Sequence, residues 1–360
     1  MPIGPARRIR ALERWNSRRI FFDMSAAALE SLEPEIDAFR PHPLLRGGHL
    51  QTLFPFLFPA TPSDTNAVRF VVPLPDGDAL VLHVDSPANW RPGDGVVLML
   101  HGLAGCHRSP YMIRIARLLN QQGLQTFRMN ARAAGDGMEL AKRPYHAGRS
   151  EDVATAIAAV AERCPGSPIL LAGFSLGAVV MLKHAGESAG ARHPAWKGLL
   201  AVCPPADLSR CVQRMQLPTN RLYDWFFCRL LRRHLSDWQR VNPLAPRVKF
   251  SRPPRRLLDF DEAFTAPLAG FESADHYYRE CSPVRFLDRI EVPTLVLASC
   301  NDPLAPAKDL SRAKVSPAVT RRIEPGGHLG FYARRGANGR RWLDAFVASW
   351  AAKALRERTP

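Results

Sequence analysis

The stretch that most constrains this chain is residues 168–182, PILLAGFSLGAVVML. A short apolar run leads into a turn containing Gly173, Ser175 and Gly177, and a longer apolar run follows it. This pattern predicts a buried strand, a sharp turn and a buried helix. A turn of this kind holds its central residue in a strained conformation, and the two glycines remove side chains that would collide there. We therefore expect the Ser175 hydroxyl to stand exposed at the end of a strand.

The remaining chain alternates strand and helix patterns. An antiparallel hairpin is predicted at 68–72 and 79–84. The other predicted strands lie at 96–100, 124–129, 198–202, 293–298 and 319–323, and helices are predicted at 113–123, 151–163 and 342–355. This order predicts an α/β fold with a mostly parallel central sheet, helices on both faces, and functional loops beyond the carboxyl ends of the strands.

The same patterns suggest a domain organisation. We expect an irregular N-terminal extension over 1–65 and a core formed by 66–206 and 286–360. The segment 207–285 follows the sixth core strand and is expected to be an inserted helical cap.

A serine nucleophile needs a base that takes its proton and an acid that orients the base. Asp302 follows the predicted strand 293–298, and His328 follows the last strand within PGGHLG. Both residues therefore lie on loops after late strands, and the three residues follow one another in the order Ser175, Asp302, His328. We expect them to form a catalytic triad. The rival bases are His101 and His146, and the rival acids are Asp261 and Asp288; His101 is expected instead to tie its own loop together.

A tetrahedral intermediate also needs hydrogen-bond donors for its oxyanion. The backbone N–H of Leu176, directly after Ser175, is one candidate. The loop HGLAG at 101–105 supplies the other, the N–H of Leu103, because its glycines permit a tight backbone. The alternative for this loop is a plain turn between strand and helix.

Composition narrows the class of protein. The 360 residues are 46% hydrophobic and 23% charged, as in a globular chain. Seven scattered cysteines contain no CxxC pair and no Cys/His cluster at zinc spacing, so we expect reduced thiols and no metal site. The basic N-terminus has no apolar signal-peptide core, and no apolar run is long enough to span a membrane. The sequence therefore predicts a cytoplasmic protein without a transmembrane segment.

The net charge of +16 is concentrated in one segment. Residues 207–256 contain eleven Arg and one Lys against three Asp. A helix is predicted at 221–241, with an apolar side formed by Phe227, Leu230, Leu231, Leu235 and Trp238 and a basic side formed by Arg229, Arg232, Arg233 and Arg240. One interpretation is a cap helix packed on the core. The other is a peripheral contact with an anionic membrane surface, at the inner face of the membrane. Nucleic-acid binding is disfavoured because the sequence contains no recognised nucleic-acid module.

Several stretches together resemble the YheT-like branch of the α/β-hydrolase superfamily, which includes mammalian hydrolases of the ABHD type. They are HLQTLFP (49–55), HGLAGCHRSPYM (101–112), YHAGRSED (145–152), GFSLG (173–177), YYRECSPVRFLDRIEVPTLVL (277–297), DPLAP (302–306) and GGHLGF (326–331). Two stretches depart from the family pattern, namely NARAAGDG (130–137) and the Ala178-Val179 pair after the turn. The resemblance implies a serine hydrolase of carboxylic esters that needs no cofactor, with Ser175, Asp302 and His328 as its triad.

The predicted substrates are short- to medium-chain acyl esters or acylglycerols, cleaved through an acyl-enzyme. Two alternatives stay open. One is an acyltransferase or thioesterase that uses the same triad, and the other is a binding protein on a hydrolase fold that lacks activity.

Overall fold

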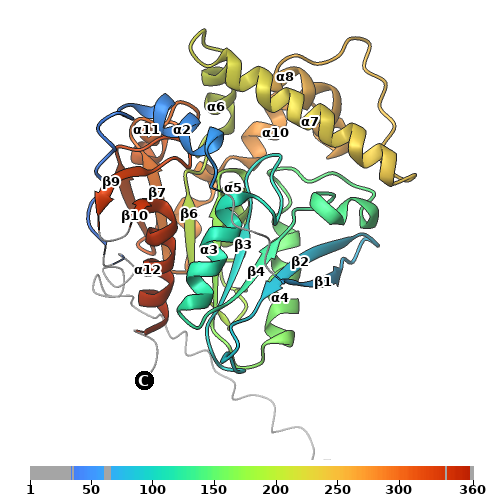
Figure 1. Cartoon of the computed structure of the whole chain (residues 1–360). Coiled ribbons are helices and arrows are strands. Elements are labelled where there is room, and N and C mark those ends of the chain that lie inside the picture. The colour runs from blue at the N-terminus through green and yellow to red at the C-terminus, as the bar shows by residue number, and fades with distance from the viewer. Residues whose placement is uncertain (1–33, 35, 61–65, 337–338, 357–360) are drawn as a thin grey trace, which may run out of the picture.

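The structure is a computed structural model that describes residues 34, 36–60, 66–336 and 339–356 (Figure 1). The basic first 20 residues lie outside this part. The described chain is built on an eight-stranded sheet with the order β1-β2-β4-β3-β5-β6-β7-β8. Only the β1–β2 and β2–β4 pairs are antiparallel, so the sheet is mostly parallel, as predicted.

The predicted strands and helices are present with small shifts at their ends. The sheet consists of β1 (Val68–Pro73), β2 (Ala79–Asp85), β3 (Val96–Leu100), β4 (Gln125–Met129), β5 (Ile169–Phe174), β6 (Trp196–Val202), β7 (Thr294–Ser299) and β8 (Val319–Glu324). The helices that cover it are α3 (Pro110–Gln121), α4 (Ser150–Arg163), α5 (Leu176–Glu187) and α12 (Trp342–Arg356), and α11 (Ala307–Arg312) precedes β8. A small hairpin, β9 (Tyr332–Gly336) and β10 (Gly339–Arg341), was not predicted.

Strand β3 shows how the sheet is buried on both faces. Val96, Leu98 and Leu100 belong to the apolar core shared with α4 and α5. Val97 and Met99 point the other way, into the core shared with α3 and α12. Successive side chains of a strand face opposite sides, so an all-apolar strand needs a helical layer on each. The prediction of helices on both faces is therefore confirmed.

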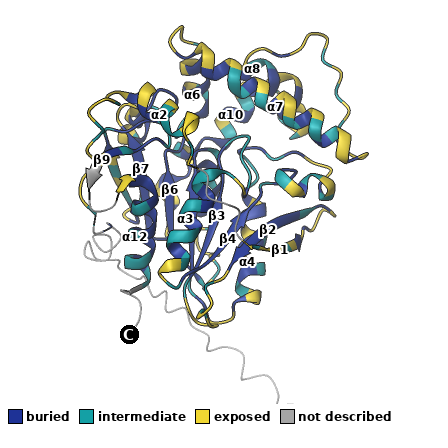
Figure 2. Cartoon of the chain, viewed as in Figure 1, coloured by how far each residue is buried: buried dark blue, intermediate teal, exposed yellow. Residues whose placement is uncertain are grey.

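The segment between β6 and β7 forms a separate helical layer (Figures 1 and 2). It contains α6 (Leu208–Met215), α7 (Arg221–Val241), α8 (Leu257–Phe260), a π-helical turn η2 (Asp261–Thr265), α9 (Ala266–Leu268) and α10 (Ala274–Cys281), with 3₁₀ turns η3 (Pro283–Arg285) and η4 (Leu287–Arg289) after it. Another 3₁₀ turn, η1 (Gly135–Leu140), follows β4. Helices α6, α7, α8 and α10 share a third apolar core with Val179 of α5. The helix predicted over 221–241 is confirmed with these bounds.

The prediction that residues 1–65 are irregular is wrong for part of that range. Gly48–Leu57 form helix α2, which begins after Gly47 and continues past Pro55. Its polar residue Gln51 is buried and hydrogen-bonded to both backbone groups of Tyr332, through its Oε1 at 2.7 Å and its Nε2 at 3.1 Å. Tertiary hydrogen bonds therefore hold α2 against strand β9. Helix propensity depends on neighbouring residues only and cannot predict a helix that is held in this way.

Among the helices of the described residues, none is long and apolar enough to cross a membrane.

Candidate active site

Ser175 occupies the sharp turn between β5 and α5. Its φ of 52° and ψ of −116° lie outside the regions that residues with side chains ordinarily occupy. A Cβ on Gly177 would lie 2.4 Å from the Leu100 carbonyl oxygen, and one on Gly173 would lie 2.7 Å from the Ala178 Cα. The two glycines are therefore steric requirements of this turn, which holds Ser175 at the carboxyl end of β5.

The structure brings the three predicted triad side chains into one hydrogen-bonded chain. Ser175 Oγ lies 2.8 Å from His328 Nε2, and His328 Nδ1 lies 2.8 Å from Asp302 Oδ2. An ionised carboxylate only accepts hydrogen bonds, so the proton of the neutral imidazole belongs on Nδ1. Nε2 is then the acceptor that faces the Ser175 hydroxyl.

Asp302 is buried and held in place by its own loop. Its Oδ1 accepts hydrogen bonds from the backbone N–H groups of Leu304 at 2.8 Å and Ala305 at 2.9 Å. These bonds leave Oδ2 for His328. The carboxylate is thereby fixed in the orientation that the imidazole requires.

The loop that carries His328 rests on helix α2. The backbone N–H of His328 donates to Thr52 Oγ1 at 2.8 Å, and that hydroxyl donates to the Gly48 carbonyl at 2.7 Å. The Gly327 N–H donates to the Gly330 carbonyl and closes the loop. A helix from the segment predicted to be irregular therefore positions the histidine.

The 101–105 loop lies against the serine turn. Tyr111 Oη accepts from the Gly102 N–H, and Tyr145 Oη accepts from the Ala104 N–H, each at 3.0 Å. Between these two anchored residues lies Leu103, which lines the same pocket as Leu176, Ser175 and His328. The two predicted oxyanion residues thus line the pocket that contains Ser175.

The two rival bases have other surroundings. Both ring nitrogens of His101 are engaged with backbone, Nδ1 with the Gly102 carbonyl at 2.7 Å and Nε2 with the Ala131 N–H at 3.1 Å. These bonds confirm that His101 ties its loop together. His146 lines the pocket, and its Nδ1 accepts from the Gly148 N–H at 3.1 Å.

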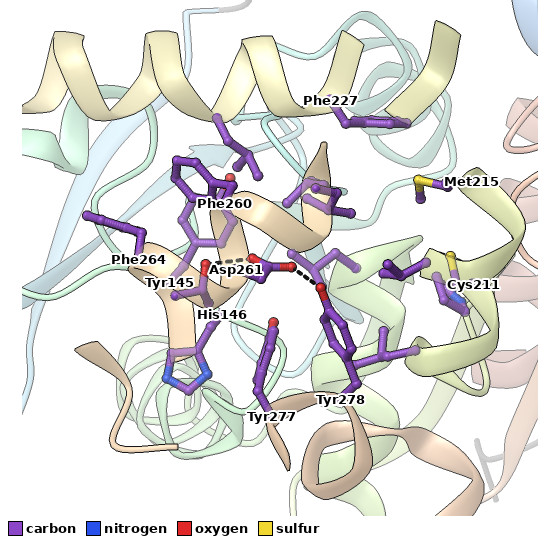
Figure 3. Close-up of a pocket in the computed structure, with 18 of the residues that line it drawn as sticks. Tyr145, His146, Cys211, Met215, Phe227, Phe260, Asp261, Phe264, Tyr277 and Tyr278 are labelled. Carbon is purple, nitrogen blue, oxygen red and sulfur yellow. Dashed lines mark hydrogen bonds between the residues drawn. The ribbon is translucent and has the colours of Figure 1, made fainter. Parts of the chain in front are cut away.

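An apolar pocket extends from Ser175 into the helical layer (Figure 3). Phe227 and Leu231 of α7, Met215 of α6 and Phe260 of α8 line it. The side chains of this wall come from the segment 207–285, whereas Ser175 directly follows strand β5 of the sheet. An apolar wall with a few polar groups is typical of a pocket for small organic ligands.

The rival acid Asp261 contributes a polar side chain to the lining of this pocket (Figure 3). Its carboxylate accepts hydrogen bonds from Tyr278 Oη at 2.7 Å and Thr265 Oγ1 at 2.6 Å. Burial raises the pKa of Asp261 to about 6. It begins the π-helical turn η2, an irregularity that is frequent at functional sites.

Asp152, within the YHAGRSED stretch, lies in the first turn of α4. Its carboxylate pairs with Arg132, with Oδ2 3.0 Å from Arg132 Nε. The same guanidinium lies 2.9 Å from Asp78. Asp152 therefore belongs to a buried ion-pair cluster under the loop after β4.

One group of side chains has the composition of a metal site. His83, His107 and Asp136 place ligand atoms within 4.8 Å of one another, the one such group in the described part of the chain. The two imidazole rings are stacked face to face, 3.4 Å apart and 4° from parallel, so their in-plane lone pairs run side by side and do not converge. His83 Nε2 instead bonds Asp136, and His107 Nδ1 lies 3.1 Å from Asn130. The geometry fits a hydrogen-bond network and not a tetrahedral site.

Burial lowers the pKa of five histidines. It brings His101, His107, His184 and His234 to about 4 and His146 to about 3. Because these values lie below the ordinary value of 6.5, the unfolded chain binds protons first as the pH falls. Their contribution to stability is therefore complete above about pH 6.5 and is lost toward pH 4.

We expect the free energy of unfolding to fall steadily between about pH 6.5 and about pH 4, on the order of 1 kcal/mol for each buried histidine. Urea unfolding at a series of pH values measures it. In a His184→Gln variant the pH dependence should be shallower by close to one bound proton. A stability that did not change over this range would contradict the prediction.

Three residues with positioning contacts were missed from the sequence, namely Thr52, Tyr111 and Tyr145. Each lies in a stretch that carried the family resemblance, HLQTLFP, HGLAGCHRSPYM or YHAGRSED. That was the only available signal, because a hydroxyl that binds a distant backbone group leaves no periodic pattern.

The chain is similar to known hydrolases over most of its length. Residues 97–338 match the family model described as "Alpha/beta hydrolase family". The putative esterase YheT of Escherichia coli (strain K12) is 27% identical over 321 residues, which cover 86% of this chain and 92% of that protein. The human phospholipase ABHD3 is 26% identical over 263 residues, which cover 71% of this chain but only 62% of its own length.

Among solved structures, Est1E from Butyrivibrio proteoclasticus aligns with a TM-score of 0.52 at 15% identity and covers 80% of this chain and 99% of its own. At this identity the likeness concerns the fold alone.

Proposed function

Because the chain belongs to the alpha/beta hydrolase family, we propose that it is a carboxylic ester hydrolase whose nucleophile is Ser175. The observation that carries this proposal is the unbroken hydrogen-bond chain from Ser175 through His328 to Asp302, set at the end of an apolar pocket. The esterase and phospholipase names of its relatives support the same reaction class.

In the proposed reaction, Ser175 Oγ attacks the acyl carbon while His328 Nε2 takes its proton. Collapse of the tetrahedral intermediate breaks the bond to the alcohol, which leaves with the proton from His328. Water then attacks the acyl-enzyme, again with His328 as base, and releases the acid. Asp302 stays ionised and stabilises the imidazolium formed in both halves.

The negative charge on the acyl oxygen needs donors in place before the reaction. We assign this role to the backbone N–H groups of Leu176 and Leu103. Leu176 is the first residue of α5, where free N–H groups and the helix dipole favour an anion. The Tyr111 and Tyr145 hydroxyls hold the loop that carries Leu103.

The pocket lining supports an ester with an apolar acyl group. We propose that the segment 207–285 is a cap whose side chains Phe227, Leu231 and Phe260 receive a short- to medium-chain acyl group. The pair of Asp261 and Tyr278 gives this wall one place to bind a hydroxyl, as in an acylglycerol. The exposed arginines of α7 support the further proposal that the protein contacts anionic membranes peripherally.

A fluorophosphonate probe tests the reaction class, because it reacts only with an activated serine. We expect labelling of the native protein and none of the Ser175→Ala variant. A series of p-nitrophenyl esters of increasing acyl length then measures the pocket, and kcat/KM should pass through an optimum. Absence of labelling in a folded native protein would overturn the assignment.

A further inference from the structure

Helix α2 has its polar and apolar sides reversed relative to an ordinary surface helix. Gln51 is fully buried, with an exposed fraction of 0%, and its amide also donates to the Leu45 carbonyl at 2.8 Å. Leu57 on the outer side is 63% exposed. A surface helix normally buries its apolar stripe, so the outward side of α2 needs an explanation.

The first turns of α7 lie beside α2 and continue its apolar side. The Phe56 and Phe226 rings meet at 5.3 Å, and the His49 ring stacks on Tyr223 at 5.7 Å. Leu222, in the same part of α7, is 79% exposed. Exposed residues on both helices appear in yellow in Figure 2.

We call this region the α2–α7 surface; its exposed apolar members are Leu50, Leu53, Phe56, Leu57, Phe58, Leu222 and Trp225. Single exposed apolar side chains are ordinary, but a group of seven, six on two adjacent helices and Phe58 directly after α2, is typical of a binding surface. Aromatic and leucine side chains of this kind insert into the boundary between lipid headgroups and acyl chains.

The charges around this surface indicate which partner it binds. Arg46 precedes α2, Arg221 begins α7, and both side chains are exposed. Arg229 lies over the Trp225 ring at 5.4 Å, which sets a cation directly beside an exposed aromatic residue. The acidic residue in the first turns of α7, Asp224, is buried and accepts from the Leu257 N–H. The exposed charge here is therefore positive, complementary to an anionic lipid surface.

From these observations we infer that the α2–α7 surface docks on an anionic lipid bilayer. The apolar residues enter the headgroup region and the arginines contact the lipid phosphates. The membrane-contacting region thus includes a helix outside the basic segment that the sequence singled out.

The same two helices belong to the active site. Thr52 of α2 holds the backbone of His328, and Phe227 and Leu231 of α7 line the pocket. Docking would therefore place the membrane next to the elements that form the pocket. This part of the inference rests on the proposed function, whereas the docking itself is measured without turnover.

Vesicle co-sedimentation of the full chain, carrying Ser175→Ala, tests the docking. Vesicles of phosphatidylcholine alone are compared with vesicles of rising phosphatidylglycerol content, at low and high salt. We expect binding that rises with anionic lipid and falls with salt. The variant Leu57→Glu/Leu222→Glu should lower the partition coefficient at least tenfold, and Arg221→Gln/Arg229→Gln should lower it and weaken its salt dependence.

Val68→Glu is the matched control, because Val68 is 59% exposed but lies on β1 at the other edge of the sheet. It should bind as the parent protein does. Absence of binding to any vesicle, or full binding by the Leu57→Glu/Leu222→Glu variant, would overturn the inference. A dimer in sedimentation velocity that this variant dissociates would assign the surface to a second copy of the chain instead. If docking holds while Ser175 fails to label, the proposed reaction falls and the docking stands.

Discussion

Replacement of Ser175 by alanine is expected to lower kcat for ester hydrolysis by about four to six orders of magnitude, because the covalent route is lost. His328→Ala should cost a similar amount, since no other base lies within hydrogen-bond distance of Ser175 Oγ among the contacts described. Steady-state kinetics on a soluble ester measure both effects, and circular dichroism reports whether the fold is kept.

Asp302→Asn distinguishes orientation from charge at the same site. The amide oxygen can keep the bonds from Leu304 and Ala305, which leaves the NH₂ group facing His328 Nδ1. That forces the imidazole proton to Nε2, where it can no longer accept from Ser175. We expect a loss of about three to four orders of magnitude in kcat.

Near-native turnover in His328→Ala would show the base assignment to be wrong and direct attention to His146.

The second large effect concerns stability. Arg132→Met should lower the free energy of unfolding by about 3–5 kcal/mol, because it removes one partner of a buried ion-pair cluster. The Arg132 side chain contacts Asp152 and Asp78, whose side chains are 3% and 0% exposed and would lose their buried cationic partner. Urea unfolding at neutral pH measures the loss.

Arg143→Met is the matched control, because Arg143 reaches the same acidic cluster from a side chain that is 45% exposed. An exposed pair of this kind contributes at most about 1 kcal/mol. Equal losses of stability from the two variants would contradict the expected effect of burial.

Arg132 follows Ala131, whose N–H donates to His101. The Arg132→Met variant should therefore also lower kcat, because it loosens the 101–105 loop.

The parts of the fold that the sequence predicted are those with uniform local patterns. The β3 and β5 strands are entirely apolar because helices cover both faces, and that composition is visible without coordinates. The turn at Ser175 could be predicted equally well, since its glycines are required by steric contacts that the turn itself creates. Asp302 and His328 could be located because they follow strands whose carboxyl ends meet at one edge of the sheet.

The parts that could not be predicted depend on contacts distant in sequence. Helix α2 buries Gln51 and exposes leucines, so its pattern is the reverse of the one that identifies a surface helix. Hairpin β9–β10 contains arginines and few apolar residues and is held by pairing with its neighbour. Asp152 lies in the first turn of α4, where an acidic residue is favourable for local reasons alone, but its partner Arg132 lies 20 residues earlier and is recognisable only once β4 is in place.

The hydrogen bond between Thr52 and His328 joins residues 276 positions apart. Contacts of such sequence separation cost the most loop-closure entropy and form late in folding. During synthesis, Ser175 and the sheet strands up to β6 emerge from the ribosome well before the loop that carries His328. The nascent chain should thus hold an assembled Ser175 turn without its His328 partner, and the proposed hydrolysis should appear only when these two distant parts of the chain meet.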